Sequence, residues 1–201
     1  MPRLKAAAFL IAGVGLAAGA TSATAAECVA PAGPYDLTHE QALDVYNCLK
    51  DDLYAGYQKG DKRWVPEEFV RDYRTWRAAS IAPANPGFHS SRFLFTYVND
   101  IGFDAYTKYE EDPEIPAGTV IAKESFSIGD DGATRRGPLF LMEKVAAGVS
   151  PETNDWYYMM VSQNGAPQAV DVETACSACH MENYGHQGEL GYPIEDVRLT
   201  N

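Results

Sequence analysis

The stretch Arg92-Phe93-Leu94-Phe95-Thr96-Tyr97-Val98 decides the fold. Aromatic and β-branched residues fill it and the turn residues Asn99 and Asp100 end it, which is typical of a β-strand. Three later segments have the same character and follow after short connections: residues 118–128, 139–145 and 156–161. Because short connections favour antiparallel neighbours, the sequence predicts an antiparallel sheet of about four strands within residues 90–165.

Helical patterns precede this sheet. Thr38, with Gln41 three residues later, is a capping-box pattern, and apolar residues then recur at helical spacing until Gly60. A second helix is predicted over residues 66–79, where an aromatic stripe follows a proline suited to a first turn. A short third helix is predicted within the sheet region, over residues 103–111 between the first two strands. Helices packed to one side of an antiparallel sheet make the fold class α+β.

The pentapeptide Cys176-Ser177-Ala178-Cys179-His180 is the pattern for covalent attachment of a c-type haem. If the segment is helical, positions 176, 179 and 180 lie on one face. Two sulfurs could then form thioethers along one porphyrin edge while His180 binds the iron. A thioredoxin-like redox pair would need a βαβ context, and a zinc knuckle would need a second ligand pair. Haem c is therefore favoured over a disulfide or a metal clip.

The first 26 residues are predicted to be a signal peptide. Arg3 and Lys5 precede an uncharged apolar run over residues 6–20, and small residues around Ala25 and Ala26 offer a cleavage site. About 15 apolar residues are too few to span a bilayer core of about 30 Å, so we expect no stable membrane insertion. Export to the periplasm agrees with the haem motif, because c-type maturation occurs outside the cytoplasm.

Cys28 and Cys48 are the two cysteines that do not belong to the haem motif. An oxidising compartment favours a disulfide between them over two thiols. The bridge would close a loop of about 20 residues, which contributes on the order of 3 kcal/mol to stability.

Residues 27–201 are enough for one domain with its own core. We expect a helical part over 27–89, the sheet over 90–165 and the haem-attachment segment over 166–201. Loss of the two basic leader residues takes the net charge from −12 to −14. Such acidity argues against nucleic acid and anionic membranes as partners, and favours a basic partner or simple solubility.

The order of five motifs resembles the cytochrome P-460 family over roughly residues 90–185. These motifs are residues 97–100, 116–124, 139–144, 156–158 and 176–180. The resemblance implies a mostly antiparallel β haem protein with histidine as proximal ligand, related to cytochrome c'-beta. Some members oxidise hydroxylamine with a haem cross-linked to a lysine and a nearby carboxylate that moves protons. Others present phenylalanine to the iron and bind nitric oxide or similar gases.

Lys123 is the candidate for the cross-linking lysine, with Lys108 as the weaker alternative. Strand alternation places Lys123 on the same face as Ile121 and Ser125, and Glu124 on the other face. Burial beside a porphyrin would lower the pKa of the Lys123 amine and free it as a nucleophile. The alternative is a solvent-facing lysine paired with an acid.

Glu143 is the candidate for the carboxylate that moves protons. It shares a strand face with Leu139 and Leu141, and apolar surroundings would raise its pKa. The alternative is a cross-strand ion pair with Lys123 or Lys144.

Several further side chains could face the haem. Arg92 could neutralise a haem propionate or orient an oxyanion, or be a surface charge. Phe126 and Phe140 could cap the distal face, or belong to the core. The remaining candidates for a sixth ligand or a haem contact, each with a core or surface alternative, are Met142, Met159, Met160, Met181 and His186.

Two classes of function follow from these observations. One is a periplasmic haem oxidoreductase that acts on hydroxylamine or a related small nitrogen compound and passes electrons to an external acceptor, such as another cytochrome. The other is a five-coordinate haem protein that binds or senses nitric oxide. A plain electron-transfer cytochrome ranks third, and a homodimer stays open.

Overall fold

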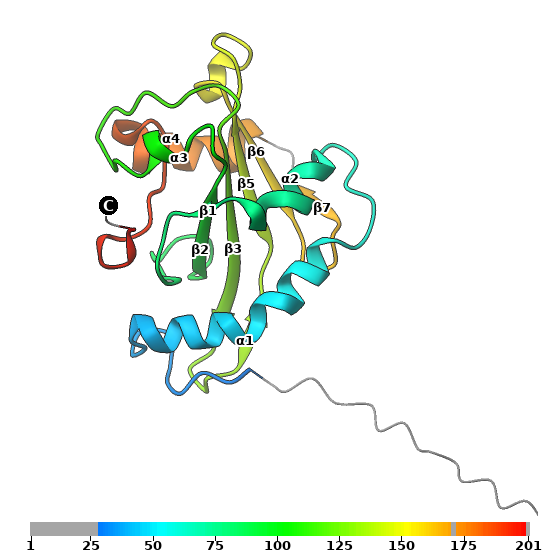
Figure 1. Cartoon of the computed structure of the whole chain (residues 1–201), viewed down its shortest axis with the longest axis vertical. Coiled ribbons are helices and arrows are strands. Elements are labelled where there is room, and N and C mark those ends of the chain that lie inside the picture. Colours follow the sequence, from blue (N-terminus) through cyan, green and yellow to red (C-terminus); the bar gives the residue numbers. More distant parts are fainter. Residues whose placement is uncertain (1–27, 170–171, 200–201) are drawn as a thin grey trace, which may run out of the picture.

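The computed structural model describes residues 28–169 and 172–199 (Figure 1). The predicted signal peptide lies outside the described residues. The helices are α1 (His39–Tyr57), α2 (Glu67–Asp72), α3 (Phe103–Tyr106) and α4 (Ala178–Tyr184). Short 3-10 turns are Tyr73–Thr75, Pro151–Thr153, Gly185–Gln187 and Glu195–Val197, and Val172–Ser177 is a π-helical segment. Within the described residues, no helix has the length and apolar character needed to cross a membrane.

One antiparallel sheet forms the centre of the molecule. Its strands are β1 (Arg77–Ala78), β2 (Phe93–Val98), β3 (Val120–Ile128), β4 (Thr134–Arg136), β5 (Leu139–Lys144), β6 (Trp156–Val161) and β7 (Pro167–Ala169). Their order is β1-β2-β3-β5-β6-β7, and β4 pairs with β3 beside this path. The α+β class is confirmed, and the four predicted strands are β2, β3, β5 and β6. The described sheet has three strands more than predicted, because two or three residues are too few to show an alternating pattern.

Helix α1 follows its sequence signals closely. The Thr38 side chain accepts a hydrogen bond from the Gln41 backbone N–H, and the Gln41 side chain accepts one from the Thr38 N–H. This capping box fixes the start of the helix. Its buried face packs on the sheet, and Leu53 and Tyr57 are fully buried there.

The predicted helix over residues 66–79 is wrong in its second half. Helix α2 ends at Asp72, and Arg77 and Ala78 pair with β2 as an edge strand. The reason is tertiary, because the Tyr73 and Arg74 side chains both bond to the buried Glu124 of β3. The predicted helix over residues 103–111 is also shorter than expected, since α3 ends at Tyr106.

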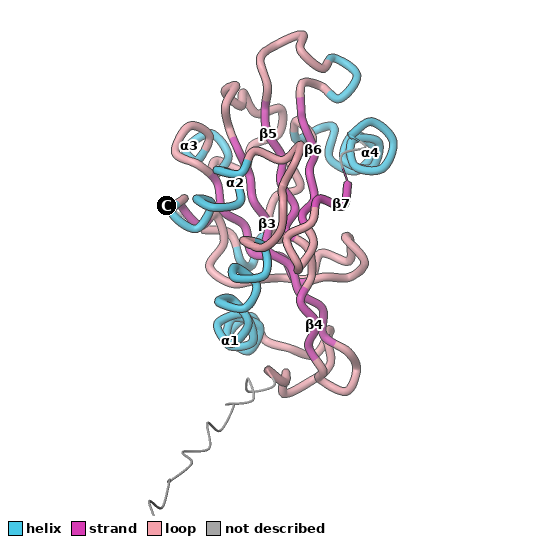
Figure 2. Tube along the Cα trace, turned by 90° about the vertical axis from the view of Figure 1, so that its right-hand side faces the viewer, coloured by secondary structure: helices cyan, strands magenta, loops and turns pink. Residues whose placement is uncertain are grey.

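The two faces of the sheet bury two different clusters. Figure 2 shows α1 and α2 on one side of the sheet and α4 on the other. The α1 side holds the larger core, which includes Phe126, Leu139 and Leu141. The opposite side packs Ile121 and Tyr158 against the C-terminal part of the chain. Each strand therefore sends alternate side chains into two separate buried environments.

The disulfide predicted between Cys28 and Cys48 is present. It joins the N-terminal segment to α1, 20 residues away along the chain. The Thr134 hydroxyl donates to the Cys28 carbonyl, and Val29 pairs with Ala133. The bridge thus fastens the start of the described chain to both α1 and the hairpin at β4.

Candidate functional site

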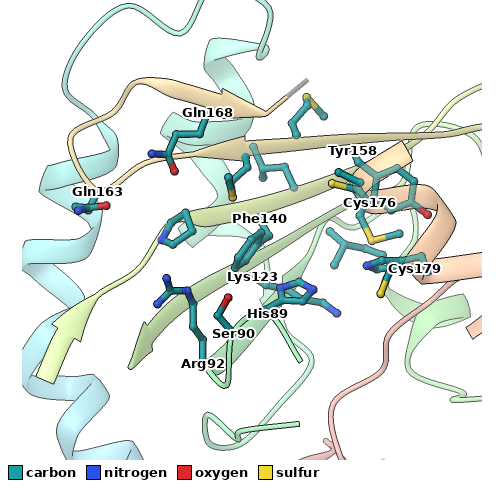
Figure 3. Close-up of a pocket in the computed structure, with 18 of the residues that line it drawn as sticks. His89, Ser90, Arg92, Lys123, Phe140, Tyr158, Gln163, Gln168, Cys176 and Cys179 are labelled. Carbon is teal, nitrogen blue, oxygen red and sulfur yellow. The ribbon is translucent and has the colours of Figure 1, made fainter. Parts of the chain in front are cut away.

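A cavity of about 550 Å³ lies between the sheet and α4. Strands β3, β5 and β6 line one side of it, with Lys123, Phe140 and Tyr158 (Figure 3). Cys176 and Cys179 line it from the C-terminal segment. The volume falls within the range of about 300–1,000 Å³ that is usual for small-molecule and cofactor sites.

The motif Cys176 to His180 spans the junction between the π-helical segment and α4. The His180 ring is buried, and its Nδ1 lies 2.7 Å from the Glu189 carbonyl oxygen. Because a carbonyl only accepts, Nδ1 carries the proton and Nε2 keeps its lone pair. Burial, with the nearby charge of Lys123, lowers the pKa of His180 to about 4. The ring is therefore a neutral imidazole, which is the form that binds a metal.

Lys123 projects from β3 into the same cavity. Its side chain is buried, and Nζ donates to the Gly191 carbonyl. Burial lowers the pKa of this amine to about 8. The structure therefore places Lys123 inside the molecule, and the solvent-facing alternative does not describe it. Lys108, the weaker alternative, is exposed.

Glu143 lies on the other face of the sheet. In β5, Phe140 and Met142 line the cavity, whereas Leu139 and Leu141 belong to the core on the α1 side, although Leu141 also borders the cavity. Alternation places Glu143 on the face of Leu139 and Leu141. Burial and the charge of Glu68 raise the pKa of Glu143, which agrees with a position facing α2. Glu143 is not among the residues lining the cavity, so the structure does not bring it together with Lys123 and His180.

The other predicted residues divide between the cavity and the rest of the molecule. Arg92 and Phe140 line the cavity, whereas Phe126 is fully buried on the α1 side and stacks on Phe93 with ring centres 5.3 Å apart. Met142, Met159 and Met160 also line the cavity. Met181 and His186 are exposed.

Arg136, Gln163 and Gln168 also line the cavity. They add polar groups that the sequence analysis did not single out.

His89 is the main cavity residue that sequence reasoning missed. It precedes β2 in a connection rich in proline and glycine, where no periodicity marks a side chain as inward-facing. Its ring centre lies 4.2 Å from that of Phe140 and 6.2 Å from that of His180. Burial, Lys123 and His180 lower the pKa of His89 to about 3, so this imidazole is also neutral. A lone histidine next to a predicted strand start was the only available signal.

These residues fit a haem. Two thiols and a neutral imidazole whose Nε2 keeps its lone pair lie on one wall, and arginines that could meet propionates lie on another wall of the same cavity. The arrangement defines a haem-binding class of protein. The family model described as Cytochrome P460 matches residues 70–187.

The match covers more than half of the chain, so the chain belongs to the Cytochrome P460 family. The resemblance drawn from the five motifs is thereby confirmed. The matched range includes the whole motif from Cys176 to His180, whereas α1 and the disulfide lie outside it. No curated protein matched the chain.

Proposed function

We propose that this chain is an exported cytochrome with one covalently bound haem c. Thioethers would form at Cys176 and Cys179, and His180 would bind the iron through Nε2. The observation that carries this proposal is the His180 hydrogen bond to the Glu189 carbonyl, which turns a neutral imidazole toward a cavity lined by both thiols. The haem, when bound, supplies an iron site for a small ligand and one-electron redox chemistry.

The covalent link has a direct test. We expect the mature protein to keep its pigment through acid–acetone extraction, and its intact mass to exceed the polypeptide mass by one haem. The Cys176→Ser, Cys179→Ser double variant should lose the pigment under the same extraction. A colourless mature protein, or a pigment that washes out, would contradict the proposal. The N-terminal sequence of the periplasmic fraction checks cleavage near Ala25 or Ala26.

The substrate class that fits best is a small nitrogen compound, hydroxylamine or nitric oxide. Lys123 supports oxidation of hydroxylamine, because its buried amine has a pKa of about 8, so that about a tenth of it is neutral at pH 7. A neutral amine could form the lysine–haem cross-link of the hydroxylamine-oxidising members: a C–N bond would replace one amine N–H and one porphyrin C–H, two protons would be released, and two electrons would pass to an oxidant such as a peroxide. The net negative charge of the chain would favour an external electron acceptor with a positively charged docking surface.

Binding of nitric oxide without turnover is the second candidate. It is supported by the placement of Glu143 on the opposite sheet face and by the aromatic ring of Phe140 in the lining. Among the described lining residues there is no carboxylate that could take substrate protons directly. The residues of this lining support binding of a ligand to the iron better than they support removal of protons from a substrate.

Two measurements separate these candidates. Peptide mapping of the holoprotein by mass spectrometry shows whether the peptide that contains Lys123 is covalently linked to the haem peptide. Hydroxylamine-dependent reduction of a soluble acceptor shows turnover. Cross-linking with turnover, both lost in Lys123→Met and kept in the exposed-lysine control Lys108→Met, supports the oxidase. An unmodified Lys123, no turnover and tight nitric oxide binding would support the second candidate.

A further inference from the structure

We propose that His89 is a second, displaceable axial ligand of the haem iron. The resting haem would then have two histidine ligands, and a small ligand would bind only after His89 leaves. This inference rests on the proposed attachment of haem at Cys176, Cys179 and His180. It assigns a role to a residue that neither the motif nor the resemblance points to.

The distance between the two histidine rings carries the argument. Their ring centres lie 6.2 Å apart. An iron–imidazole bond is about 2 Å long and the bonded nitrogen lies about 1.2 Å from its ring centre, so two imidazoles on opposite sides of one iron have centres roughly 6.4 Å apart. The observed separation matches this value. Both rings line the same cavity, on which Cys176 and Cys179 also open.

The His89 ring also contacts another residue of the cavity lining. Its ring packs edge-on against Phe140 at 4.2 Å, and this contact holds the imidazole inside the cavity. The His89 Nδ1 atom is buried and has no hydrogen-bond partner among the described residues. A buried imidazole nitrogen normally has a partner, and coordination of the metal would supply one. Cavity-lining methionines are the competing ligands. The Tyr158 and Tyr184 rings also lie near His180, with ring centres at 5.0 Å and 5.6 Å, but both are closer than two rings that share one iron would be.

The backbone conformation around His89 explains why this histidine could be displaced from the iron. His89, Ser90 and Ser91 have φ angles of 54°, 60° and 53°, a region that residues other than glycine rarely adopt. Gly87, at φ 80°, precedes them, and a Cβ there would meet nothing within 4 Å. These three strained residues form a segment whose release would relieve strain, and the Asn85 side chain, which accepts from the Gly87 N–H and donates to the Ser91 carbonyl, holds the segment in this conformation. The iron–His89 bond would therefore be weaker than the iron–His180 bond, whose imidazole sits on a helix.

Electron paramagnetic resonance and optical spectra of the matured ferric holoprotein test this inference. We expect a low-spin, six-coordinate haem in the wild type and a high-spin haem in His89→Ala. Millimolar imidazole should return His89→Ala to low spin. The matched control is Ser90→Ala, which changes the next residue of the same segment and should stay low-spin.

Ligand kinetics give a second readout. Carbon monoxide should bind the ferrous wild type at a rate that saturates at high ligand concentration, because His89 must leave first. In His89→Ala, binding should be at least about tenfold faster and show no saturation, because the binding-competent fraction is then complete.

Failure of this inference is distinct from failure of the proposed function. A covalent haem that is high-spin in the wild type, or that stays low-spin in His89→Ala, would overturn the role of His89 and leave haem attachment intact. If His89→Ala does not retain haem, the wild-type spin state and its carbon monoxide kinetics decide alone. A colourless wild type would overturn the proposed function itself.

Discussion

The buried carboxylate of Glu124 allows a sharp stability test through Arg74. Glu124 is fully buried, and Arg74 donates to its Oε1 from Nη2 at 2.8 Å and from Nε at 2.9 Å. The Tyr46 and Tyr73 hydroxyls also donate to this carboxylate. Burial and the charge of Glu124 raise the pKa of both tyrosines, so both keep their protons and remain donors. Arg74 is thus the only group bonded to Glu124 that cancels its charge within the described residues.

We predict that Arg74→Leu strongly destabilises the fold. The variant leaves an uncompensated buried carboxylate, and removing one partner of a buried pair costs about 3–5 kcal/mol. At roughly 2–4 °C per kcal/mol for a chain of this size, Tm should fall by about 6–20 °C. Far-UV circular dichroism melts and guanidinium unfolding measure both quantities. The haem spectrum should stay unchanged, because this cluster lies on the sheet face opposite the cavity.

The matched control is Arg71→Leu. Arg71 lies in α2 and pairs with Asp72 at 2.6 Å, but both side chains are largely exposed. The variant makes the same change in charge and should cost no more than about 1 kcal/mol. Adding Glu124→Gln to Arg74→Leu should recover part of the loss, because the unpaired charge is then removed. An Arg74→Leu variant that loses no more stability than Arg71→Leu would refute the reasoning.

Three further perturbations probe other parts of the fold. Replacing both Cys28 and Cys48 with alanine should lower the free energy of unfolding by about 3 kcal/mol, measured in denaturant, with the haem spectrum unchanged; a loss below about 1 kcal/mol would contradict this. Gly165→Ala should lower Tm far more than Gly148→Ala, because both have positive φ but only the first would place a Cβ against the Lys59 carbonyl; equal losses would show that the clash relaxes. In the folded apoprotein the pKa of Lys123 is lowered from 10.5 to about 8, so between these pH values the Lys123 amine is protonated in the unfolded chain but neutral in the folded one. The free energy of unfolding therefore rises with pH from about 8 to 10.5. The unfolding free energy of the wild type relative to Lys123→Met should therefore grow by about 2 kcal/mol between pH 8 and 10, and a flat difference would exclude a desolvated amine.

Local sequence signals were sufficient where the structure is locally determined. Strand β2 and helix α1 were predicted because alternation and a capping box act over a few neighbouring residues. The helix predicted over residues 66–79 was partly wrong because the bonds from Tyr73 and Arg74 to Glu124 override helical preference. Those bonds join positions about 50 residues apart, which no local pattern reveals.

The candidate site shows the same division. Alternation correctly grouped Glu143 with Leu139 and Leu141, and Lys123 opposite Glu124. It gave only relative faces, however, and did not say which face of the sheet meets the cavity. Glu143, which the sequence predicts to serve the iron, is not among the residues that line the cavity. His89 was missed for a different reason, since its position depends on the backbone angles of a connection without periodicity.

A single short segment after α4 organises the site. The Glu189 carbonyl accepts from His180 Nδ1, and two residues later the Gly191 carbonyl accepts from Lys123 Nζ. A Cβ at position 191 would lie 3.3 Å from Lys123 Nζ and 3.3 Å from Tyr184, so glycine leaves room for the lysine. The Tyr158 hydroxyl fixes the Glu189 side chain at 2.5 Å, which ties the segment to β6. One rigid turn therefore sets both the tautomer of the iron ligand and the direction of the buried amine. It follows that the ligand and the amine are positioned together, whereas His89 is positioned by a different connection, the one that precedes β2.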